Sequence, residues 1–113
     1  MIQQEYLQFT IRVGRNKEEN SQIIASSRAD DMWVHLSDFP SGHAVIANPR
    51  NIKIPRKVLK RACCLVKQYS KYSSIKKIDF DITQIKYLEK TEHKGQVIVH
   101  KILKKICIFV EPK

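Results

Sequence analysis

Hydrophobic and polar residues alternate with a period of two in several stretches, which predicts strands that bury one face. In residues 6–13 one side is apolar, formed by Leu7, Phe9, Ile11 and Val13. In residues 75–83 the apolar side is formed by Ile78, Phe80 and Ile82, opposite Asp79 and Asp81. Those two carboxylates lack a third acid at a metal-binding spacing, so a solvent-facing strand edge is preferred over a catalytic pair. The predicted strands are residues 6–13, 32–36, 43–47, 75–83, 96–100 and 105–111.

The end of the chain is predicted to form a hairpin, in which residues 96–100 and 105–111 pair around residues 102–104. Both faces of the last strand are apolar, since Ile106, Ile108 and Val110 alternate with Cys107 and Phe109. This pattern predicts a strand inside the sheet or under the long helix. Residues 84–90 fit either one helical turn or an irregular strand, in which Tyr87 either packs or stacks on a base.

A period of 3.6 residues predicts two helices. The long one runs over residues 55–72, with Pro55 at its first position. Its packing face is formed by Val58, Ala62, Leu65, Val66 and Tyr69, and a cationic face by Arg56, Lys60, Lys67 and Lys71. The short helix is capped by Asn20 or Ser21 and ends near Arg28, with Ile23 and Ile24 as apolar contacts. We therefore predict a single α+β domain over residues 1–113, a mostly antiparallel sheet with one long and one short helix packed against it.

Residues 31–48 combine the only Trp with two of the four His. Residues 37–42 are rich in turn formers, which predicts a hairpin between the flanking strands. With its centre near Phe39, the core side pairs Leu36 with Gly42, Val34 with Ala44, and Met32 with Ile46. The opposite face pairs His35 with His43 and Trp33 with Val45, so two imidazoles and an indole share a surface.

The net charge of +10 and the pI of about 9.7 favour an anionic partner. RNA, DNA and an acidic membrane all satisfy charge alone. No apolar run approaches the roughly 20 residues of a membrane span, and the start MIQQEYLQ has no signal-peptide core. We expect a soluble, cytoplasmic protein without a membrane partner. Cys63, Cys64 and Cys107 suggest neither a disulfide framework nor a metal knuckle, so buried free thiols are expected.

The chemistry of the 31–48 hairpin suits unpaired RNA. Lys and Arg would contact phosphates, Trp33 would stack on a base, and the His side chains would hydrogen-bond ribose or base edges. Alternatively, Trp33 covers the core and the His pair only holds the hairpin. His35 and His43 could also act as general base and acid in phosphodiester cleavage. As zinc ligands they would supply two of the four that a structural site needs, so no metal or other cofactor is predicted.

Two further features carry positive charge. On the long helix, Lys60 and Lys67 are either phosphate contacts or part of a solvated face. In the turn Gly14-Arg15-Asn16, backbone N–H groups and the Arg side chain could hold a phosphate. The turn lacks the longer glycine-rich signature of a nucleotide-binding loop, so a plain turn is a strong alternative. Neither feature selects RNA over another anion.

Several short motifs together resemble the NFACT-R family. They are Gly14-Arg15-Asn16 followed by Glu19-Asn20; Asp31, Trp33 and His35; Pro40 to His43; and Lys94, Gly95 and Val97. In that family the domain forms the C-terminal part of ribosome quality-control factors and also occurs as short stand-alone proteins. The resemblance implies RNA as ligand, either tRNA or ribosomal RNA, and possible contact with the ribosome.

The combined prediction is an RNA-binding module without catalytic activity, acting in translation or ribosome-associated quality control. The alternatives are an RNA-directed hydrolase that uses His35 and His43, and a basic adaptor for an acidic protein. The oligomeric state is left open, as is action in trans with a protein that supplies the other family domains. The candidate RNA contacts are Arg15, Asn16, Asn20, Trp33, His35, Ser41, His43, Lys60, Lys67, Lys90 and Lys94.

Overall fold

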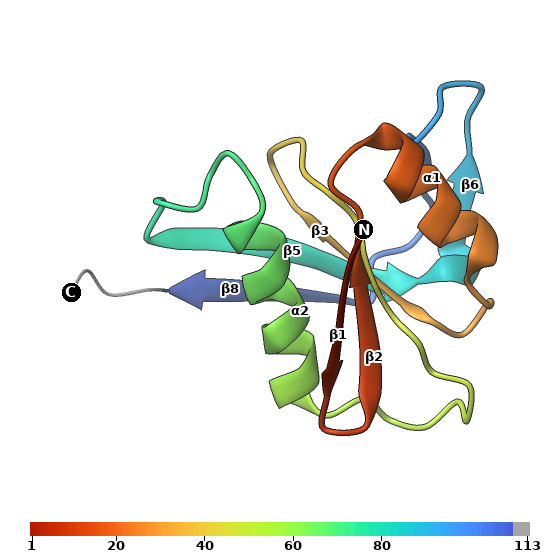
Figure 1. The fold of residues 1–113 in the computed structure, drawn as a ribbon, viewed down its shortest axis with the longest axis horizontal. Helices are drawn as coiled ribbons and strands as arrows, with labels where there is room; N and C mark the ends of the chain where they lie inside the picture. The colour runs from red at the N-terminus through yellow and green to blue at the C-terminus, as the bar shows by residue number, and fades with distance from the viewer. Residues whose placement is uncertain (110–113) are drawn as a thin grey trace.

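The computed structural model describes residues 1–109 and contains a six-stranded antiparallel sheet, a two-stranded sheet and two α-helices. The main sheet has the order β1-β2-β4-β3-β5-β8, and β6 pairs with β7. The predicted α+β class is confirmed (Figure 1). In chain order the elements are β1 (Ile2–Tyr6), β2 (Phe9–Val13), α1 (Lys17–Ser26), β3 (Met32–Leu36), β4 (Ala44–Ile46), α2 (Arg56–Gln68), β5 (Lys77–Gln84), the 3-10 turn η1 (Ile85–Tyr87), β6 (Leu88–Lys90), β7 (Val97–Val99) and β8 (Lys104–Phe109).

The first hairpin was not predicted. The expected strand over residues 6–13 is interrupted at Leu7 and Gln8, whose φ angles are 49° and 70°. Two consecutive positive φ angles form a tight turn that matches the twist of paired strands. Tyr6 therefore pairs with Phe9, and β1 is an edge strand that precedes β2. The prediction was wrong because alternation continued across a turn that contains neither Gly nor Asn.

The short helix α1 begins earlier than predicted. Asn16, and not Asn20 or Ser21, is its N-cap, because the Asn16 side chain accepts a hydrogen bond from the Glu19 backbone N–H at 2.9 Å. Ile23 and Ile24 are buried, as predicted. Asn20 thus lies inside the helix, where its side chain is free to serve another purpose.

The predicted register of the β3–β4 hairpin is confirmed. Met32 pairs with Ile46, Trp33 with Val45, and Val34 with Ala44. β5 pairs with both β3 and β8, so Asp79 and Asp81 belong to an interior strand and not to a sheet edge. Asp81 accepts a hydrogen bond from Ser37 at 2.8 Å and forms an ion pair with Lys105 at 3.1 Å.

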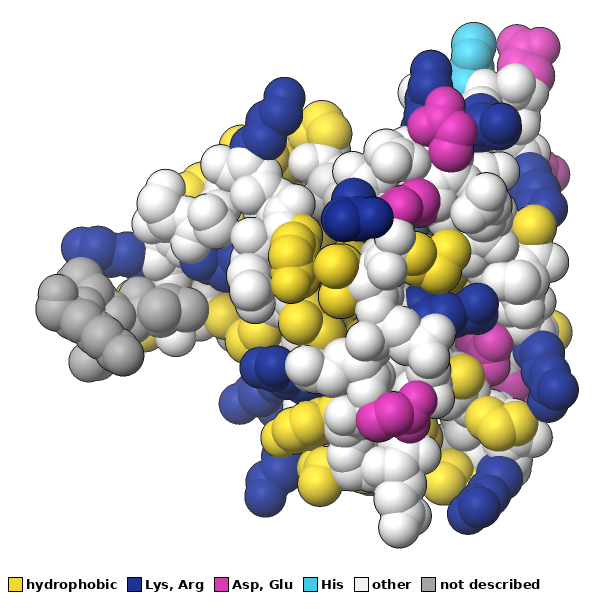
Figure 2. All heavy atoms as spheres, viewed as in Figure 1, with side chains coloured by type: hydrophobic (Ala, Val, Ile, Leu, Met, Phe, Trp, Pro, Cys, Tyr) yellow, Lys and Arg dark blue, Asp and Glu magenta, His cyan; other side chains and the backbone are white. Residues whose placement is uncertain are grey.

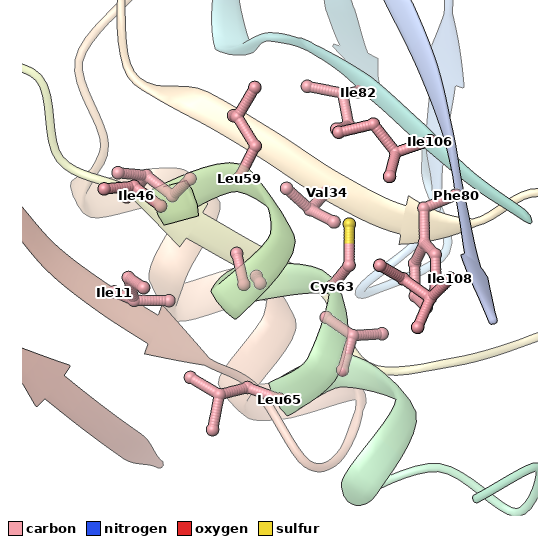
Figure 3. Close-up of a cluster of buried hydrophobic side chains, with 14 of the residues drawn as sticks. Ile11, Val34, Ile46, Leu59, Cys63, Leu65, Phe80, Ile82, Ile106 and Ile108 are labelled. Atoms are coloured by element: carbon pink, nitrogen blue, oxygen red, sulfur yellow. The ribbon is translucent and has the colours of Figure 1, made fainter. Parts of the chain in front are cut away.

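The long helix α2 covers one face of the main sheet. Its buried positions include Val58, Ala62, Leu65 and Val66, as the pattern predicted. Figure 3 shows its side chains meeting those of the strands, among them Leu59 and Cys63 near Val34. The helix ends at Gln68, and Tyr69 is 46% exposed, so the prediction that the helix reached residue 72 and buried Tyr69 was wrong. Pro55 is the N-cap and not the first helical residue, so the helix begins at Arg56, one position later than predicted.

The two C-terminal strands do not pair with each other. β7 pairs with β6, whereas β8 crosses to the main sheet and pairs with β5. The Thr83 hydroxyl donates to the Lys101 carbonyl and the Leu103 N–H to the Ile82 carbonyl, which holds the crossing segment. The predicted terminal hairpin was therefore wrong. Of the two positions predicted for the last strand, the sheet interior was wrong because β8 is an edge strand, whereas packing under the long helix is confirmed, since Ile106 and Ile108 are buried in the cluster that α2 covers. Val110 and Glu111 lie outside the described residues.

The face of the main sheet opposite α2 is covered by α1 and the β6–β7 hairpin. Ile23, Trp33 and Val45 form a second buried cluster there, contacted by Leu88 and Val97. An exposed aromatic sheet face was predicted, and this covering shows that prediction to be wrong. A strand period assigns a residue to a face but does not show what packs on that face.

The three cysteines are free, in two environments. Cys63 is buried as predicted, and burial raises the pKa of its thiol to about 12. Cys64 and Cys107 are exposed, contrary to prediction. Within residues 1–109, neither helix has the length and apolar character that a membrane crossing requires.

Candidate nucleic-acid interface

Two glycines and one asparagine join α1 to the strand hairpin. The Gly14 N–H donates to the His43 carbonyl at 2.9 Å, and the His43 N–H donates to Asn20 Oδ1 at 3.0 Å. A Cβ on Gly42 would lie 2.1 Å from the Gly14 carbonyl oxygen, and one on Gly14 would lie 2.1 Å from Asn20 Oδ1. Only glycine allows this approach. The motif residues Gly14, Asn20, Gly42 and His43 thus fix one junction.

Asp31, another motif residue, has a structural role. Its buried carboxylate accepts hydrogen bonds from the Asn48 N–H at 2.8 Å and the Arg28 N–H at 2.9 Å. Both donors are backbone groups that would otherwise be unpaired near the core. Asp31 therefore ties together the loops that enter β3 and leave β4.

Trp33, His35 and His43 form a compact aromatic group, as the strand register predicted. The His35 ring stacks on Trp33, with centroids 5.3 Å apart and planes 4° apart. The His43 ring stands edge-on to both, with centroids 5.3 Å from Trp33 and 5.1 Å from His35. Trp33 is 3% exposed and His43 is 5% exposed. A base cannot stack on the indole in this arrangement, so Trp33 is placed in the core, as the alternative interpretation held.

Both imidazoles are neutral at pH 7. Burial and, to a smaller extent, the neighbouring His35 together lower the pKa of His43 to about 3. Burial also lowers the pKa of His35, against the opposing effects of the Leu36 carbonyl and Asp81. His35 Nδ1 lies 2.6 Å from that carbonyl and must donate to it, which leaves His35 Nε2 as an acceptor.

A first hollow, which we call the histidine hollow, opens beside these rings. It has a volume of about 290 Å³ and lies between α1, the loop before β4, and the start of β7. Its lining consists of Asn20, Trp33, His35, Pro40, Ser41, His43, Gly95, Gln96 and Val97. Gly95 has a φ of 80°, and a Cβ there would lie 2.9 Å from the Lys17 carbonyl oxygen. Gly95 therefore lies close against the Lys17 backbone, and this close approach holds the β6–β7 hairpin against α1.

A second hollow, which we call the basic hollow, adjoins the first. It has a volume of about 360 Å³ and shares Asn20, Pro40 and Ser41 with the histidine hollow. The rest of its lining consists of Arg15, Asn16, Lys17, Gly42, Tyr69, Ser70, Lys71 and Tyr72. Phe39 stacks on Tyr72 with centroids 4.4 Å apart, which attaches the loop before β4 to the turn that follows α2.

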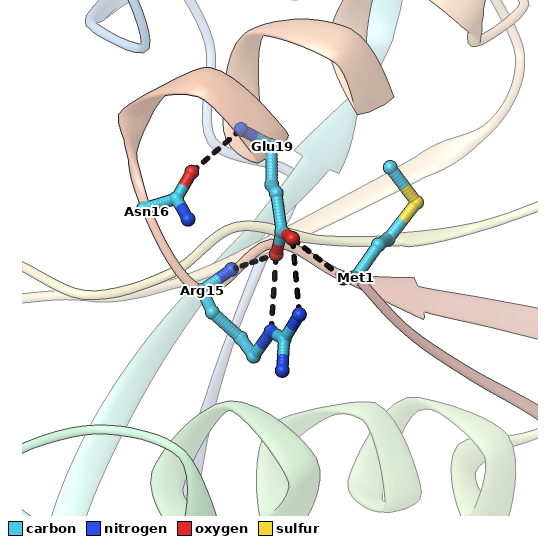
Figure 4. A network of polar contacts seen from close by, with 4 residues as sticks. All are labelled: Met1, Arg15, Asn16 and Glu19. Carbon is cyan, nitrogen blue, oxygen red and sulfur yellow. Dashed lines mark hydrogen bonds and ion pairs between the residues drawn. The ribbon is translucent and has the colours of Figure 1, made fainter.

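The charges around the basic hollow differ in how they are used. Arg15 Nε and NH2 each lie 3.2 Å from the Glu19 carboxylate, which also accepts from the Met1 ammonium group at 2.6 Å (Figure 4). These contacts lower the pKa of Glu19 to about 2, the Arg15 side chain having the largest effect. Lys17 and Lys71 are exposed and form no ion pair with any residue in the described range 1–109.

The structure groups most of the predicted contacts. Arg15, Asn16, Asn20 and Ser41 line the basic hollow, and Asn20, Trp33, His35, Ser41 and His43 line the histidine hollow. Lys90 and Lys94 line a small pocket of about 40 Å³ that shares Gly95, Gln96 and Val97 with the histidine hollow.

Two predicted contacts lie elsewhere. Lys60 is exposed on α2, outside both hollows. Lys67 is 7% exposed and its ammonium group donates to the Ser73 carbonyl at 2.5 Å, so its place in an exposed cationic face was wrong. Lys17, Tyr69 and Gln96 line the hollows but were not among the candidates. Tyr69 was missed because the predicted helix was too long and assigned this residue to its packing face. A helix that ends at Gln68 leaves Tyr69 outside that face, where it lines the basic hollow.

The known proteins that this chain resembles are longer than the chain, and the similarity covers only part of each. The chain is 29% identical over 82 residues to the Rqc2 homolog RqcH of Bacillus subtilis (strain 168), covering 72% of this chain and 14% of that protein. It is 30% identical over 111 residues to coiled-coil domain-containing protein 25 of Danio rerio, covering 82% of this chain and 54% of that protein. The chain thus spans about half of one relative and a smaller part of the other.

The fold also matches a solved structure. The C-terminal part of the fibronectin/fibrinogen-binding protein from Streptococcus suis superposes with a TM-score of 0.80 at 24% identity, covering 91% of this chain and 42% of that one. At that identity the match shows a shared fold. The family model described as NFACT protein RNA binding domain matches residues 2–101, which include both hollows. This chain therefore belongs to the NFACT RNA-binding domain family.

Proposed function

We propose that this chain is an RNA-binding module that holds the RNA backbone in the basic hollow and does not cleave it. The observation that carries the proposal is that Lys17 and Lys71, which come from distant parts of the chain and form no ion pair within residues 1–109, line one hollow with Arg15 and the exposed Tyr69. Lys and Arg contact phosphates, and an exposed aromatic ring can stack on an unpaired base.

The overall charge supports an anionic ligand but does not locate it. Figure 2 shows Lys and Arg side chains spread around the outline of one face, with fewer acidic side chains among them. With a net charge of +10, such a surface attracts RNA from any direction and accelerates encounter. The basic hollow adds a concave shape to that general attraction.

The neutral state of both imidazoles argues against the hydrolase alternative. A general acid–base pair needs one imidazole that is protonated near neutral pH. Burial keeps His43 neutral down to a pKa of about 3 and also lowers the pKa of His35, whose Nδ1–H is used by the Leu36 carbonyl. The pair therefore suits hydrogen bonding better than proton transfer.

The cellular role that we propose follows from family membership and one relative. The chain resembles the Rqc2 homolog RqcH over 72% of its length, and we propose that its RNA ligand is a tRNA or ribosomal RNA in ribosome-associated quality control. Crosslinking in cells, followed by sequencing of the joined RNA, tests this assignment.

The basic hollow is tested by charge reversal. Lys17→Glu combined with Lys71→Glu should weaken binding of a fluorescein-labelled single-stranded RNA at least tenfold in fluorescence anisotropy. Since each lost phosphate contact changes the salt slope by about 0.7 for single strands, the double variant should flatten it by about 1.4. Folding should be preserved, because a Glu at the start of α1 interacts favourably with the helix dipole.

The matched control is Lys53→Glu, an exposed lysine that lines a different hollow before α2. This variant reverses the charge of one side chain, as each single variant does, and should leave the affinity for RNA nearly unchanged. Equal losses in the control and in each single variant would show that RNA responds only to total charge, and the proposed site would be rejected. Gel analysis of the RNA after incubation tests catalysis, since cleavage that His35→Ala abolishes would establish the hydrolase.

A further inference from the structure

We propose that the histidine hollow receives one unpaired nucleobase of the RNA whose phosphate lies in the basic hollow. The inference rests on the proposed function and adds what the second hollow recognises. It predicts that the module distinguishes single-stranded RNA from a duplex, which backbone contacts alone would not do.

The two hollows differ in charge. The basic hollow has Arg15, Lys17 and Lys71 in its lining. Among the residues that line the histidine hollow, all within the described part of the chain, none is Lys, Arg, Asp or Glu. A phosphate matches the first environment and a neutral, hydrogen-bonding ring matches the second.

Two residues that line the histidine hollow each have a buried side-chain nitrogen atom without a partner in the described range. Trp33 Nε1 and His43 Nδ1 make no hydrogen bond to any residue of the described range. Both side chains are more than nine-tenths buried and both line the hollow. An unsatisfied buried polar group is unfavourable, so a ligand that reaches these atoms and supplies the missing partners gains affinity from them.

The available groups match the edge of a base. Trp33 Nε1 can only donate, and His35 Nε2 can only accept because its Nδ1–H is bound to the Leu36 carbonyl. Base edges present both acceptors and donors without a net charge. Pro40 and Val97, from separate elements, add apolar surface that a flat ring can contact.

The shared wall allows one nucleotide to reach both hollows. Asn20, Pro40 and Ser41 line both. The Ser41 hydroxyl accepts from the Leu36 N–H at 3.3 Å and donates to the Gly42 carbonyl at 2.9 Å, so it fixes the loop that separates them. Asn20 is fixed by its bond to the His43 N–H. In a duplex each base is paired and stacked, so only an unpaired base can enter.

The inference can be tested with the intrinsic fluorescence of Trp33, the only Trp in the chain. Probes are a twelve-nucleotide single-stranded RNA, the duplex of the same sequence, and an abasic ribose-phosphate strand of equal length. The single strand should quench or shift Trp33 emission and bind at least tenfold more tightly than the other two. Because all three carry phosphates, binding of each is measured separately by competition against labelled RNA.

A blocking variant provides the second measurement. Gln96→Phe places a ring at an exposed position of the hollow wall, and Gln22→Phe places the same ring on the exposed side of α1, outside both hollows. Gln96→Phe should reduce single-strand affinity about tenfold and leave duplex affinity unchanged, whereas Gln22→Phe should change neither. Circular dichroism shows whether each variant folds, and the wild-type fluorescence test stands without them.

The outcomes separate the two proposals. If none of the three probes binds, the proposed function fails. If single strand, duplex and abasic strand bind equally and Trp33 emission does not change, RNA binding stands but the nucleobase inference is overturned, and the unpaired nitrogens are then satisfied by water.

Discussion

The two faces of the main sheet are built from the same strands but differ in completeness. On the face toward α2, side chains from five strands and the helix form one large apolar cluster. On the opposite face only Ile23, Trp33 and Val45 form a buried cluster, and two buried nitrogen atoms there have no partner within the described chain. Within the described residues, the α2 face leaves no buried side-chain nitrogen or oxygen atom without a partner, whereas the opposite face leaves two such atoms in residues that line the histidine hollow.

The difference shows how one strand divides its work. In β3 the alternate residues Val34 and Leu36 join the large cluster, while Trp33 and His35 line the histidine hollow. Stability can then come mainly from one face while the other retains the polar groups that a ligand needs. Such unmet groups are expected at binding sites and are rare in a finished core.

The largest expected effect tests the apolar face. Phe80 is fully buried in the large cluster, so Phe80→Ala should lower the free energy of unfolding by roughly 3–5 kcal/mol. Urea denaturation followed by circular dichroism measures this. The matched control, Phe109→Ala, removes a ring that is 63% exposed on edge strand β8 and should cost less than about 1 kcal/mol. Similar losses would mean that the α2 face is not the main source of stability.

The second prediction concerns acid and the hollow face. His43 has a folded pKa of about 3, whereas the unfolded side chain titrates near 6.5. The unfolded state therefore binds more protons between these values, and stability falls as the pH falls through that window. The loss between neutral pH and pH 5 should be roughly 2 kcal/mol. His35, whose pKa is also lowered, acts in the same direction.

Urea titrations at pH 7.5, 6 and 5 measure this effect, with His43→Gln as control. In this variant the free energy of unfolding should fall much less between pH 7.5 and pH 5 than it does in the wild type. The pKa of Glu19 is lowered to about 2, so the stability that Glu19 provides is lost mainly below about pH 4.5, outside the range of these titrations. A wild-type stability that stays constant from pH 7.5 to 5 would show that His43 accepts a proton in the folded state, and the hollow face would be more open than the structure shows.

The third prediction separates the hollow from the core through Gly95. A residue other than glycine at a φ of 80° costs roughly 1–2 kcal/mol. The new Cβ of Gly95→Ala would also meet the Lys17 backbone at 2.9 Å, which should move the β6–β7 hairpin away from α1. Thermal unfolding should shift downward and single-strand affinity should fall. Gln96→Ala, one residue along the same hairpin, should leave thermal unfolding nearly unchanged; an equal shift would contradict the role of Gly95.

The sequence predicted the α2 face better than the hollow face, for a physical reason. Burial against a helix selects apolar residues at regular intervals, so Val34, Leu36, Phe80 and Ile82 could be assigned from periodicity alone. The His35–His43 pair also followed from the hairpin register. The hollows depend on contacts between distant segments, such as Gly95 against Lys17, and no local pattern records these. The crossing of β8 into the main sheet was missed for the same reason.

The smallest expected effect tests whether binding stays on the hollow face. Lys60 is exposed on α2 and lies outside both hollows. Lys60→Glu should change stability by less than about 0.5 kcal/mol. It should also reduce RNA affinity less than Lys71→Glu does, because salt screens charges separated by more than about 10 Å. Anisotropy titrations of both variants at 0.15 M salt compare them directly. If Lys60→Glu weakens binding as much as Lys71→Glu, RNA runs along α2 as well, and recognition would not be confined to the incomplete face.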